Sequence, residues 1–346
     1  MIRQELVVEQ GWISGCRFNR VLAVYQALPG PEAHELCVYF GMVARGRIGG
    51  LLSGLGFMLP GFVLMFTLSW IYVTFGISSP MFTAALAGFQ AAAVALVLRA
   101  VHQIGSRALV DRPLWAIAIL AGGAHLLRAN LLLILVLAGA AYALIKRQCW
   151  RSARPFCAIL PGLAFQLASA GPSILALFLS GLRSGLLTFG GAYTVIPLLQ
   201  NDAVVRGGWM TNDQFLDGLA LTSILPAPLV IFATFVGYVG GGPLGAVALT
   251  LGIFLPAFGF TLLGRDYFER LVDNPSAHAI LDGVTAGVVG LISATALFLF
   301  RDAITTVPAF GIFLLALVVL YRWKAKAAVA VVVLGAGLLG ILLFSG

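Results

Sequence analysis

Long apolar runs separated by short polar segments make up most of this chain. Four of the runs are long enough to cross a bilayer, which takes about 20 apolar residues. They are residues 51–75, 81–98, 244–263 and 279–300. Shorter apolar runs lie at residues 114–126, 131–145, 173–189, 192–199, 304–320 and 327–344. This pattern predicts an all-α polytopic membrane protein.

Two further apolar stretches contain a pair of prolines that a continuous helix cannot accommodate. The first break, residues 28–31, interrupts residues 21–44, and the second break, residues 225–228, interrupts residues 215–240. Proline removes a backbone donor and clashes with the preceding turn, so each stretch should form two short helices. Irregular backbone persists at membrane depth only where protein covers it or where it lines a watery cavity. We therefore expect two proline-broken re-entrant helical hairpins.

The two breaks belong to an internal repeat that covers most of the chain. Three stretches of the first half align with three of the second half, with one small gap between successive stretches: residues 11–31 with 208–228, 49–62 with 245–258, and 80–96 with 275–291. The glycines and prolines stay in register, which chance rarely produces. The repeat divides the chain into a first copy at residues 1–150, a linker at 151–172 and a second copy at 173–346.

Composition excludes an ordinary soluble domain. About 60% of the residues are hydrophobic and only 10% are charged. The formal net charge is +8, but the basic residues lie in short loops rather than on one face. That distribution reports membrane topology, so nucleic acid is not an expected partner.

The basic loops also indicate how each copy is oriented. In the first copy they lie near Arg45, Arg107 and Lys146, and in the second near Arg265 and Arg322. The basic loops of the second copy correspond to charge-poor loops of the first. Short loops rich in Lys and Arg stay in the cytoplasm, so corresponding loops of the two copies are expected on opposite sides of the membrane. The sequence therefore predicts inverted-topology repeats, which in secondary transporters bring broken helices to the midplane.

Several of these motifs together resemble the chromate ion transporter (CHR) family. In the second copy the match runs through residues 189–193 (Phe-Gly-Gly-Ala-Tyr), 208–211 (Gly-Trp-Met-Thr), the proline pair and residues 254–257 (Phe-Leu-Pro-Ala). In the first copy it runs through residues 28–31 and 59–61. The resemblance implies a two-domain, multi-pass transporter of the bacterial inner membrane. It would export chromate by exchange or proton coupling, with sulfate as the structural analogue. The implied partners are chromate or a related oxyanion and the lipid bilayer, and a homodimer is left open.

Two features depart from the family pattern. Ala227 stands between the prolines, where the family usually has glycine. The Phe-Gly-Gly-Pro element that opens the family's first copy has no counterpart, because residues matching 173–200 would precede Met1. A second hypothesis is therefore a truncated homologue or a partner subunit that does not transport. A third, a membrane-embedded enzyme acting on lipid phosphates, needs metal-holding acids or a nucleophile with its base. Neither is evident in the sequence.

A tetrahedral dianion needs several donors that converge in a water-poor site. Backbone N–H groups at the helix starts after Pro31 and Pro228 would supply them without permanent charge. Glycine lets the backbone approach a ligand closely. The predicted substrate-binding residues are Gln26, Pro29, Gly30, Pro31, Arg183, Thr188, Gly190, Gly191, Thr222, Ser223, Pro226, Ala227 and Pro228.

Arg183 is the most specific of these candidates, because it interrupts an otherwise apolar run. An ionisable group within the membrane is costly unless it is paired or wetted. Our hypothesis is that Arg183 neutralises the bound oxyanion. The alternative is that it snorkels to an interface or pairs with a structural acid. For Gln26, Thr222 and Ser223, the alternative to donating to the anion is that they satisfy carbonyls freed near the breaks.

Three titratable residues, Glu32, His34 and Glu35, follow the first break on one helical turn. Together they are candidates for relaying a coupling proton, with Glu32 and His34 as the named site residues, since histidine titrates near neutral pH. The alternative is that the acids cap an exposed helix start, where they suit the helix dipole. No metal or other cofactor is expected, because the remaining histidines and the four cysteines show no ligand-like spacing.

Overall fold

The computed structural model of the chain describes residues 4–15, 18, 21–22, 25, 30–75, 80–146, 172–189, 191–263, 275–323 and 328–344, and all regular structure within them is helical. The longer helices are α2 (Glu32–Phe75), α3 (Pro80–Ala108), α4 (Arg112–Leu126), α5 (Leu131–Ile145), α6 (Ile174–Leu186), α7 (Val195–Gln200), α8 (Asn212–Ile224), α9 (Phe232–Leu263), α11 (Pro275–Ala303), α12 (Val307–Arg322) and α13 (Ala328–Phe344). Single turns are η1 (Gln4–Glu9), η4 (Ala192–Thr194), η5 (Asn201–Arg206) and η6 (Leu229–Ile231).

Four helices are long and apolar enough to cross a membrane. They are Glu32–Phe75, Met81–Ala108, Leu229–Leu263 and His278–Ala303. Shorter apolar helices accompany them, and many of their large side chains are exposed, such as Leu137 at 57% and Leu342 at 76%. Apolar surface on this scale is unusual for a soluble monomer and suits contact with lipid. The prediction of an all-α membrane protein with several spans is confirmed.

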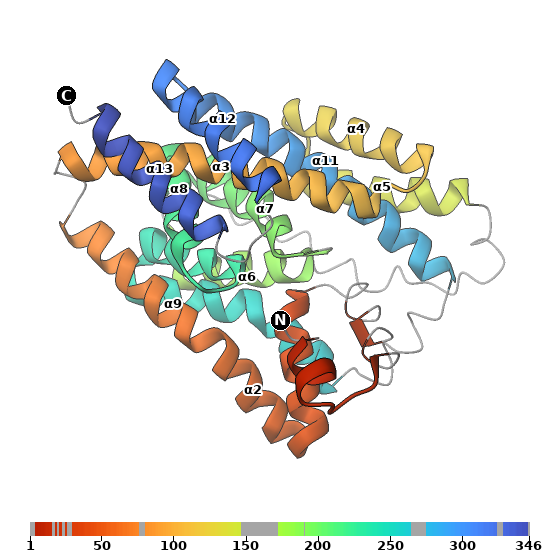
Figure 1. Cartoon of the computed structure of the whole chain (residues 1–346). Coiled ribbons are helices and arrows are strands. Elements are labelled where there is room, and N and C mark those ends of the chain that lie inside the picture. The colour runs from red at the N-terminus through yellow and green to blue at the C-terminus, as the bar shows by residue number, and fades with distance from the viewer. Residues whose placement is uncertain are drawn as a thin grey trace.

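The two longest helices are helical hairpins. In α2 the backbone leaves helical geometry at Arg45 (φ −141°, ψ 30°) and Gly46 (φ 63°, ψ −158°). The two arms of α2 then lie against each other, and Ser53 Oγ donates a 2.8 Å hydrogen bond to the Cys37 carbonyl. In Figure 1 this turn is the lower tip of the molecule. The sequence predicted a basic loop here. The chain does reverse, but within two residues, because Gly46 takes a positive φ that favours glycine.

Helix α9 reverses in the same way. Its turn is at Gly241 (φ −149°, ψ 22°) and Gly242 (φ 62°, ψ −152°), which the repeat aligns with Arg45 and Gly46. Thr234 and Thr250 hydroxyls join the two arms at 2.8 Å. The π-helical turns η1 and η5 also align, and α3 and α11 have 29 residues each. At these positions the aligned stretches of the first and second halves have closely similar backbone conformations.

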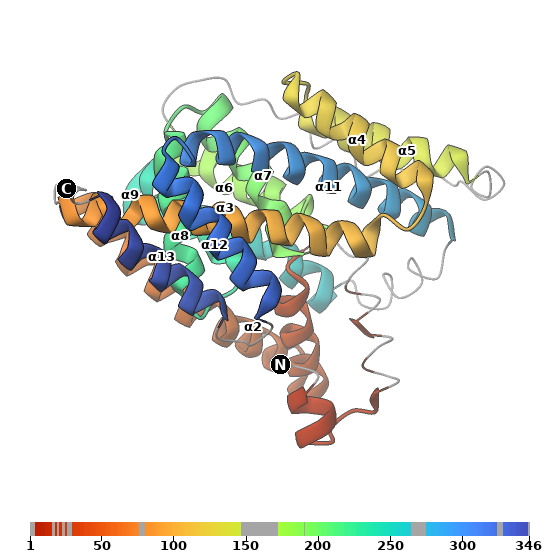
Figure 2. The ribbon, with the colours of Figure 1, turned by 45° about the horizontal axis from the view of Figure 1, so that its top comes forward.

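The two long helices α3 and α11 each pack against the final helices of the other copy. Helix α3 lies against α12 and α13, whereas α11 lies against α4 and α5 (Figures 1 and 2). Glycines bring the axes close. A Cβ at Gly88 would lie 2.0 Å from the Ala336 carbonyl oxygen, and one at Gly283 would lie 2.5 Å from that of Ala138. Such small-residue contacts are typical of packed membrane helices.

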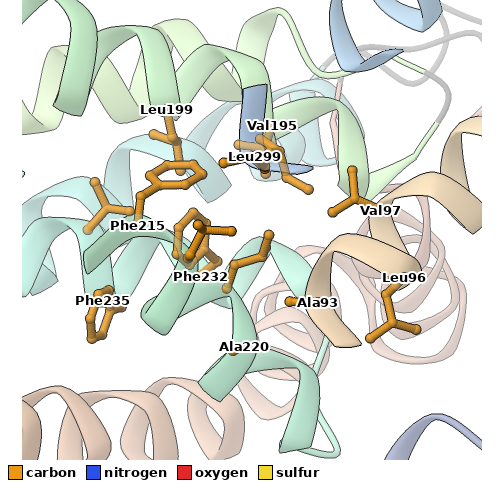
Figure 3. Close-up of a cluster of buried hydrophobic side chains, with 14 of the residues drawn as sticks. Ala93, Leu96, Val97, Val195, Leu199, Phe215, Ala220, Phe232, Phe235 and Leu299 are labelled. Carbon is orange, nitrogen blue, oxygen red and sulfur yellow. The ribbon is translucent and has the colours of Figure 1, made fainter. Parts of the chain in front are cut away.

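The largest buried apolar cluster surrounds the second break. Phe215 on α8 packs edge-on against Phe232 on α9, with 4.8 Å between ring centroids. Leu199 on α7 and Val97 on α3 border the same cluster (Figure 3). This core therefore holds the helix that leads into the second break and the helix that leaves it.

Candidate functional site at the two helix breaks

The second break lies where the prolines place it. Helix α8 ends at Ile224, Leu225 is extended (ψ 141°), and Pro228 caps η6, which continues into α9. The helices before and after the break run side by side. A Cβ at Gly218 would meet the ring of Phe235, and one at Gly240 would meet that of Trp209. The predicted hairpin therefore has a proline-rich tip, with Pro226, Ala227 and Pro228 exposed or half-buried.

The first break is described at Gly30 and Pro31, both buried, and α2 starts at the next residue. Gly30 has a φ of 147°, which an L side chain rarely adopts. Its N–H donates a 2.8 Å hydrogen bond to the Thr188 carbonyl. Gln26 and Pro29, the other candidates here, lie outside the described residues.

The loop after α6 connects the two breaks. Thr188 binds Gly30, and Gly191 (φ 126°) leads into η4, which packs against η6 at the second break. Gly190 lies outside the described part of the chain. The structure thus brings Gly30, Thr188, Gly191 and the second break into one region, although they come from three separate parts of the sequence.

Each break also lies against a short segment of the other copy, Leu-Pro-Ala at residues 255–257 for the first break and Leu-Pro-Gly at residues 59–61 for the second. A Cβ built on Gly30 would lie 3.4 Å from Ala257 Cβ, and one built on Gly61 would lie 2.8 Å from Ala227 Cβ. The repeat aligns Gly30 with Ala227 and Gly61 with Ala257. The two contacts are therefore reciprocal, and each pairs one glycine with one alanine.

Both breaks present the start of a helix. The first helical bonds run from His34 N to Pro31 O (2.8 Å) and from Ile231 N to Pro228 O (3.0 Å). The N–H groups of Ala33, Leu229 and Val230 precede these bonds, so they have no partner within their helices. They correspond to the backbone donors predicted from the sequence at the helix starts after Pro31 and Pro228.

Arg183 is paired with an acid in the second copy. Its Nη2 donates to Asp202 Oδ1 at 2.6 Å, and Ser180 Oγ donates to the other carboxylate oxygen at 2.7 Å. The two side chains are only 16% and 9% exposed. Pairing with a structural acid was the alternative left open for Arg183. Its Nε is buried and has no hydrogen-bond partner among the described residues.

The hydroxyl candidates donate backward along their own helices. Thr222 Oγ1 donates to the Gly218 carbonyl at 2.7 Å, and Ser223 Oγ to that of Leu219 at 2.8 Å. Thr188 Oγ1 likewise donates to the Ser184 carbonyl at 2.6 Å. For Thr222 and Ser223 this is the alternative role, in which the hydroxyls satisfy carbonyls near the break.

The helix start after Pro31 is only partly exposed. His34 and Glu35 have 0% exposure, Glu32 is half-buried and Ala33 is exposed. The interpretation of the acids as caps of an exposed helix start is therefore wrong for Glu35. The sequence grouped Glu35 with Glu32 and His34 on this turn. Its place one turn after Pro31 was the available signal, but its burial depends on packing against α9.

Asp217 belongs to a buried polar network beside the second break. Its carboxylate accepts hydrogen bonds from Tyr72 Oη and from Gln90 Nε2, both at 2.7 Å. These bonds join α8 to α2 and α3. The network therefore fixes the first helix of the broken hairpin to the other copy.

Removing one donor of this network should destabilise the protein. Tyr72→Phe leaves one oxygen of the buried Asp217 carboxylate without its partner, which we expect to cost about 1–3 kcal/mol of unfolding free energy. Thermal unfolding in detergent measures the change, with Tyr321→Phe, at a 44% exposed position, as the control. Equal melting temperatures for the two variants would show that the network contributes no stability.

Within the described residues, no group of three or more His, Cys, Asp and Glu side chains is arranged to hold a metal ion. The region at the breaks is built from helix starts and small residues, whereas the Arg183–Asp202 pair joins α6 to η5. Together with the long apolar helices, the region at the breaks defines the class: a polytopic membrane protein with broken helices, as in secondary transporters.

Comparison with known proteins gives the family. A family profile described as chromate transporter matches residues 1–144 and 175–341, and the chain belongs to this family. A chromate transport protein of Pseudomonas aeruginosa is 52% identical over 362 residues, which span 99% of this chain and 87% of that protein. The chromate transport protein of Cupriavidus metallidurans is 28% identical, with 99% of this chain and 87% of that protein covered.

A probable chromate transport protein of Synechococcus elongatus is 26% identical, over 99% of this chain and 90% of that protein. No solved structure gives a significant match. The family consists of transporters rather than enzymes, so the hypothesis of a lipid-phosphate enzyme is set aside.

Proposed function

We propose that this protein exports chromate, or a closely related oxyanion, across the bacterial inner membrane, with the anion bound at the two helix breaks. The observation that carries the proposal is that the segment after α6 contacts both breaks, through Thr188 at the first and through η4 at the second. Relatives named as chromate transport proteins support the choice of substrate.

The anion would be held mainly by backbone donors. The N–H groups of Ala33, Leu229 and Val230 lie at helix starts, where the dipole adds to the attraction for a negative charge. Arg183 remains a candidate although it binds Asp202, because its buried Nε–H has no partner within the described part of the chain. An anion oxygen could accept from that group without displacing Asp202.

We propose that the two copies are inverted in the membrane and alternate access around the breaks. The reciprocal contacts of Gly30 with Ala257 and of Ala227 with Gly61 support a two-fold relation between the copies. The basic loops of the second copy correspond to charge-poor loops of the first, which supports opposite orientations of the two copies. Glu32 and His34, on the first turn after Pro31, are proposed to take part in proton coupling.

Transport by the purified protein is the direct test. Proteoliposomes that contain the chain alone are expected to take up labelled chromate well above protein-free vesicles. Pro226→Ala/Pro228→Ala, which favours a continuous helix through the second break, is expected to lose most of this uptake. Inside-out membrane vesicles should accumulate chromate if the protein exports it.

Two outcomes would contradict the proposal. Absence of uptake by the well-folded protein would favour the hypothesis of a non-transporting partner subunit. Full uptake by the proline variant would show that the break is not needed for transport.

A further inference from the structure

Glu35 is a buried carboxyl at the first break, and it has no hydrogen-bond partner in the part of the chain that the structure describes. Its exposure is 0%, and neither carboxyl oxygen has a hydrogen-bond partner among the described residues. Oε1 lies 2.6 Å from the point that a Cβ of Gly30 would occupy. The carboxyl therefore lies directly against the tip of the first break.

The surroundings of Glu35 offer no counter-charge among the described residues. On its own helix the neighbouring titratable groups are Glu32, which opposes a negative charge on Glu35, His34, the Cys37 thiol and the Tyr39 hydroxyl. His34 is enclosed by Phe254 and Phe258 of α9, at 4.9 and 4.6 Å between ring centroids. The other contacts of this region, Ala257 of α9 and the Thr188 carbonyl, carry no charge.

An ionised carboxylate is costly in such a place, because it loses its hydration and gains neither a cation nor a donor. The conformation described here therefore suits Glu35 in its neutral form. A dianion bound at the neighbouring helix start would add to the cost of ionisation, since like charges in a low-dielectric site repel strongly.

We propose that Glu35 is a proton-binding site of the transporter and that it takes up one proton from solution when an oxyanion occupies the breaks. This inference rests on the proposed function. The second copy has Leu229, Ile231 and Phe232 where the first has Glu32, His34 and Glu35. The second break therefore provides no matching proton site, and one proton is linked to one anion.

The direction of the pH dependence follows from this linkage. In the anion-free protein that opens to water, Glu35 ionises as the pH rises. Binding must then return a proton to it. Above the pH at which Glu35 ionises in the anion-free protein, the dissociation constant for chromate should rise by about tenfold per pH unit, because one proton is linked to binding. Glu35→Gln, which is permanently neutral, should bind chromate with an affinity that does not change with pH.

The test uses the full chain in detergent and chromate as the probe, over the neutral to alkaline range in which chromate is a dianion. Chromate affinity is measured at each pH, and proton uptake on chromate addition is followed with a pH dye in weak buffer. We expect uptake by the wild type and by Glu9→Gln, whose carboxyl is exposed on η1, and none by Glu35→Gln.

The outcomes separate this inference from the proposed function. A wild type that binds no chromate contradicts the proposed function itself. Chromate binding without proton uptake, or uptake that persists in Glu35→Gln, overturns the inference alone. Uptake that is lost in His34→Gln but kept in Glu35→Gln assigns the proton to His34 and also overturns it. A Glu35→Gln protein that fails to fold would also overturn the inference, because glutamine matches a neutral glutamic acid in size and charge and should be accepted at this site.

Discussion

Replacing Arg183 by glutamine is expected to lower the free energy of unfolding by about 3 kcal/mol and to abolish chromate transport. The carboxylate of Asp202 is only 9% exposed, and it would keep Ser180 as its donor and Arg206 as a more distant cation but lose the cation that it contacts directly. Removing one member of a buried ion pair leaves an uncompensated charge, which is why the loss is large. Unfolding in detergent and uptake into proteoliposomes measure the two effects.

The double variant Arg183→Gln/Asp202→Asn separates the structural role of Arg183 from anion binding. It removes both charges, so most of the lost stability should return. If Arg183 also donates to the oxyanion, transport should stay abolished although the protein is stable. Recovery of both stability and transport would show that Arg183 acts only as the partner of Asp202.

Replacing Gly61 by alanine is expected to displace the second break and to impair transport strongly. The new methyl group would lie 2.8 Å from Ala227 Cβ, where neither main chain can give way easily. Overpacking of this kind costs about 1–3 kcal/mol. Gly56→Ala on the same helix is the matched control, since a Cβ there meets no atom within 4 Å. Thermal unfolding and chromate uptake are compared for the two variants.

A second substitution tests whether the contact itself is responsible. Ala227→Gly removes the opposing methyl group, so Gly61→Ala/Ala227→Gly should regain most of the stability and transport lost in Gly61→Ala. An additive loss in the double variant would contradict direct coupling between these two residues.

The contact between Ala227 and Gly61 has a counterpart at the first break. At the first break the glycine is on the break itself, as Gly30, and faces Ala257. At the second break the alanine is on the break and faces Gly61. Each contact keeps one methyl group, so the space between the copies is filled to a similar extent at both breaks.

Local signals predicted the breaks and turns of the fold well. Proline ends helices through its own ring, and basic or glycine-rich residues mark loops, so the break at residues 225–228 and the loops that hold Gly46 and Gly242 could be located from the sequence alone. The bounds predicted for the helix at residues 131–145 agree with those of α5. Such features depend on a few neighbouring residues, so they do not depend on how the rest of the chain packs.

Contacts between distant residues could not be predicted in the same way. The pairing of Arg183 with Asp202 was only one of the alternatives, and the bonds from Tyr72 and Gln90 to Asp217 were not expected. These partners are on different helices, and which of them meet depends on how helices pack. The burial of Glu35 has the same origin, because α9 covers the start of α2.

The most direct test of the central claim, that two inverted copies bring their breaks together, is sided thiol labelling at Ile48 and Leu244. These residues are equivalent in the repeat, follow the matching turns of α2 and α9, and are 73% and 69% exposed. Each is changed to cysteine in a variant without the four native cysteines, and intact cells are treated with a membrane-impermeant reagent. Inverted copies predict that one position is labelled from outside and the other only after the membrane is opened. Labelling of both positions from the same side would contradict the account.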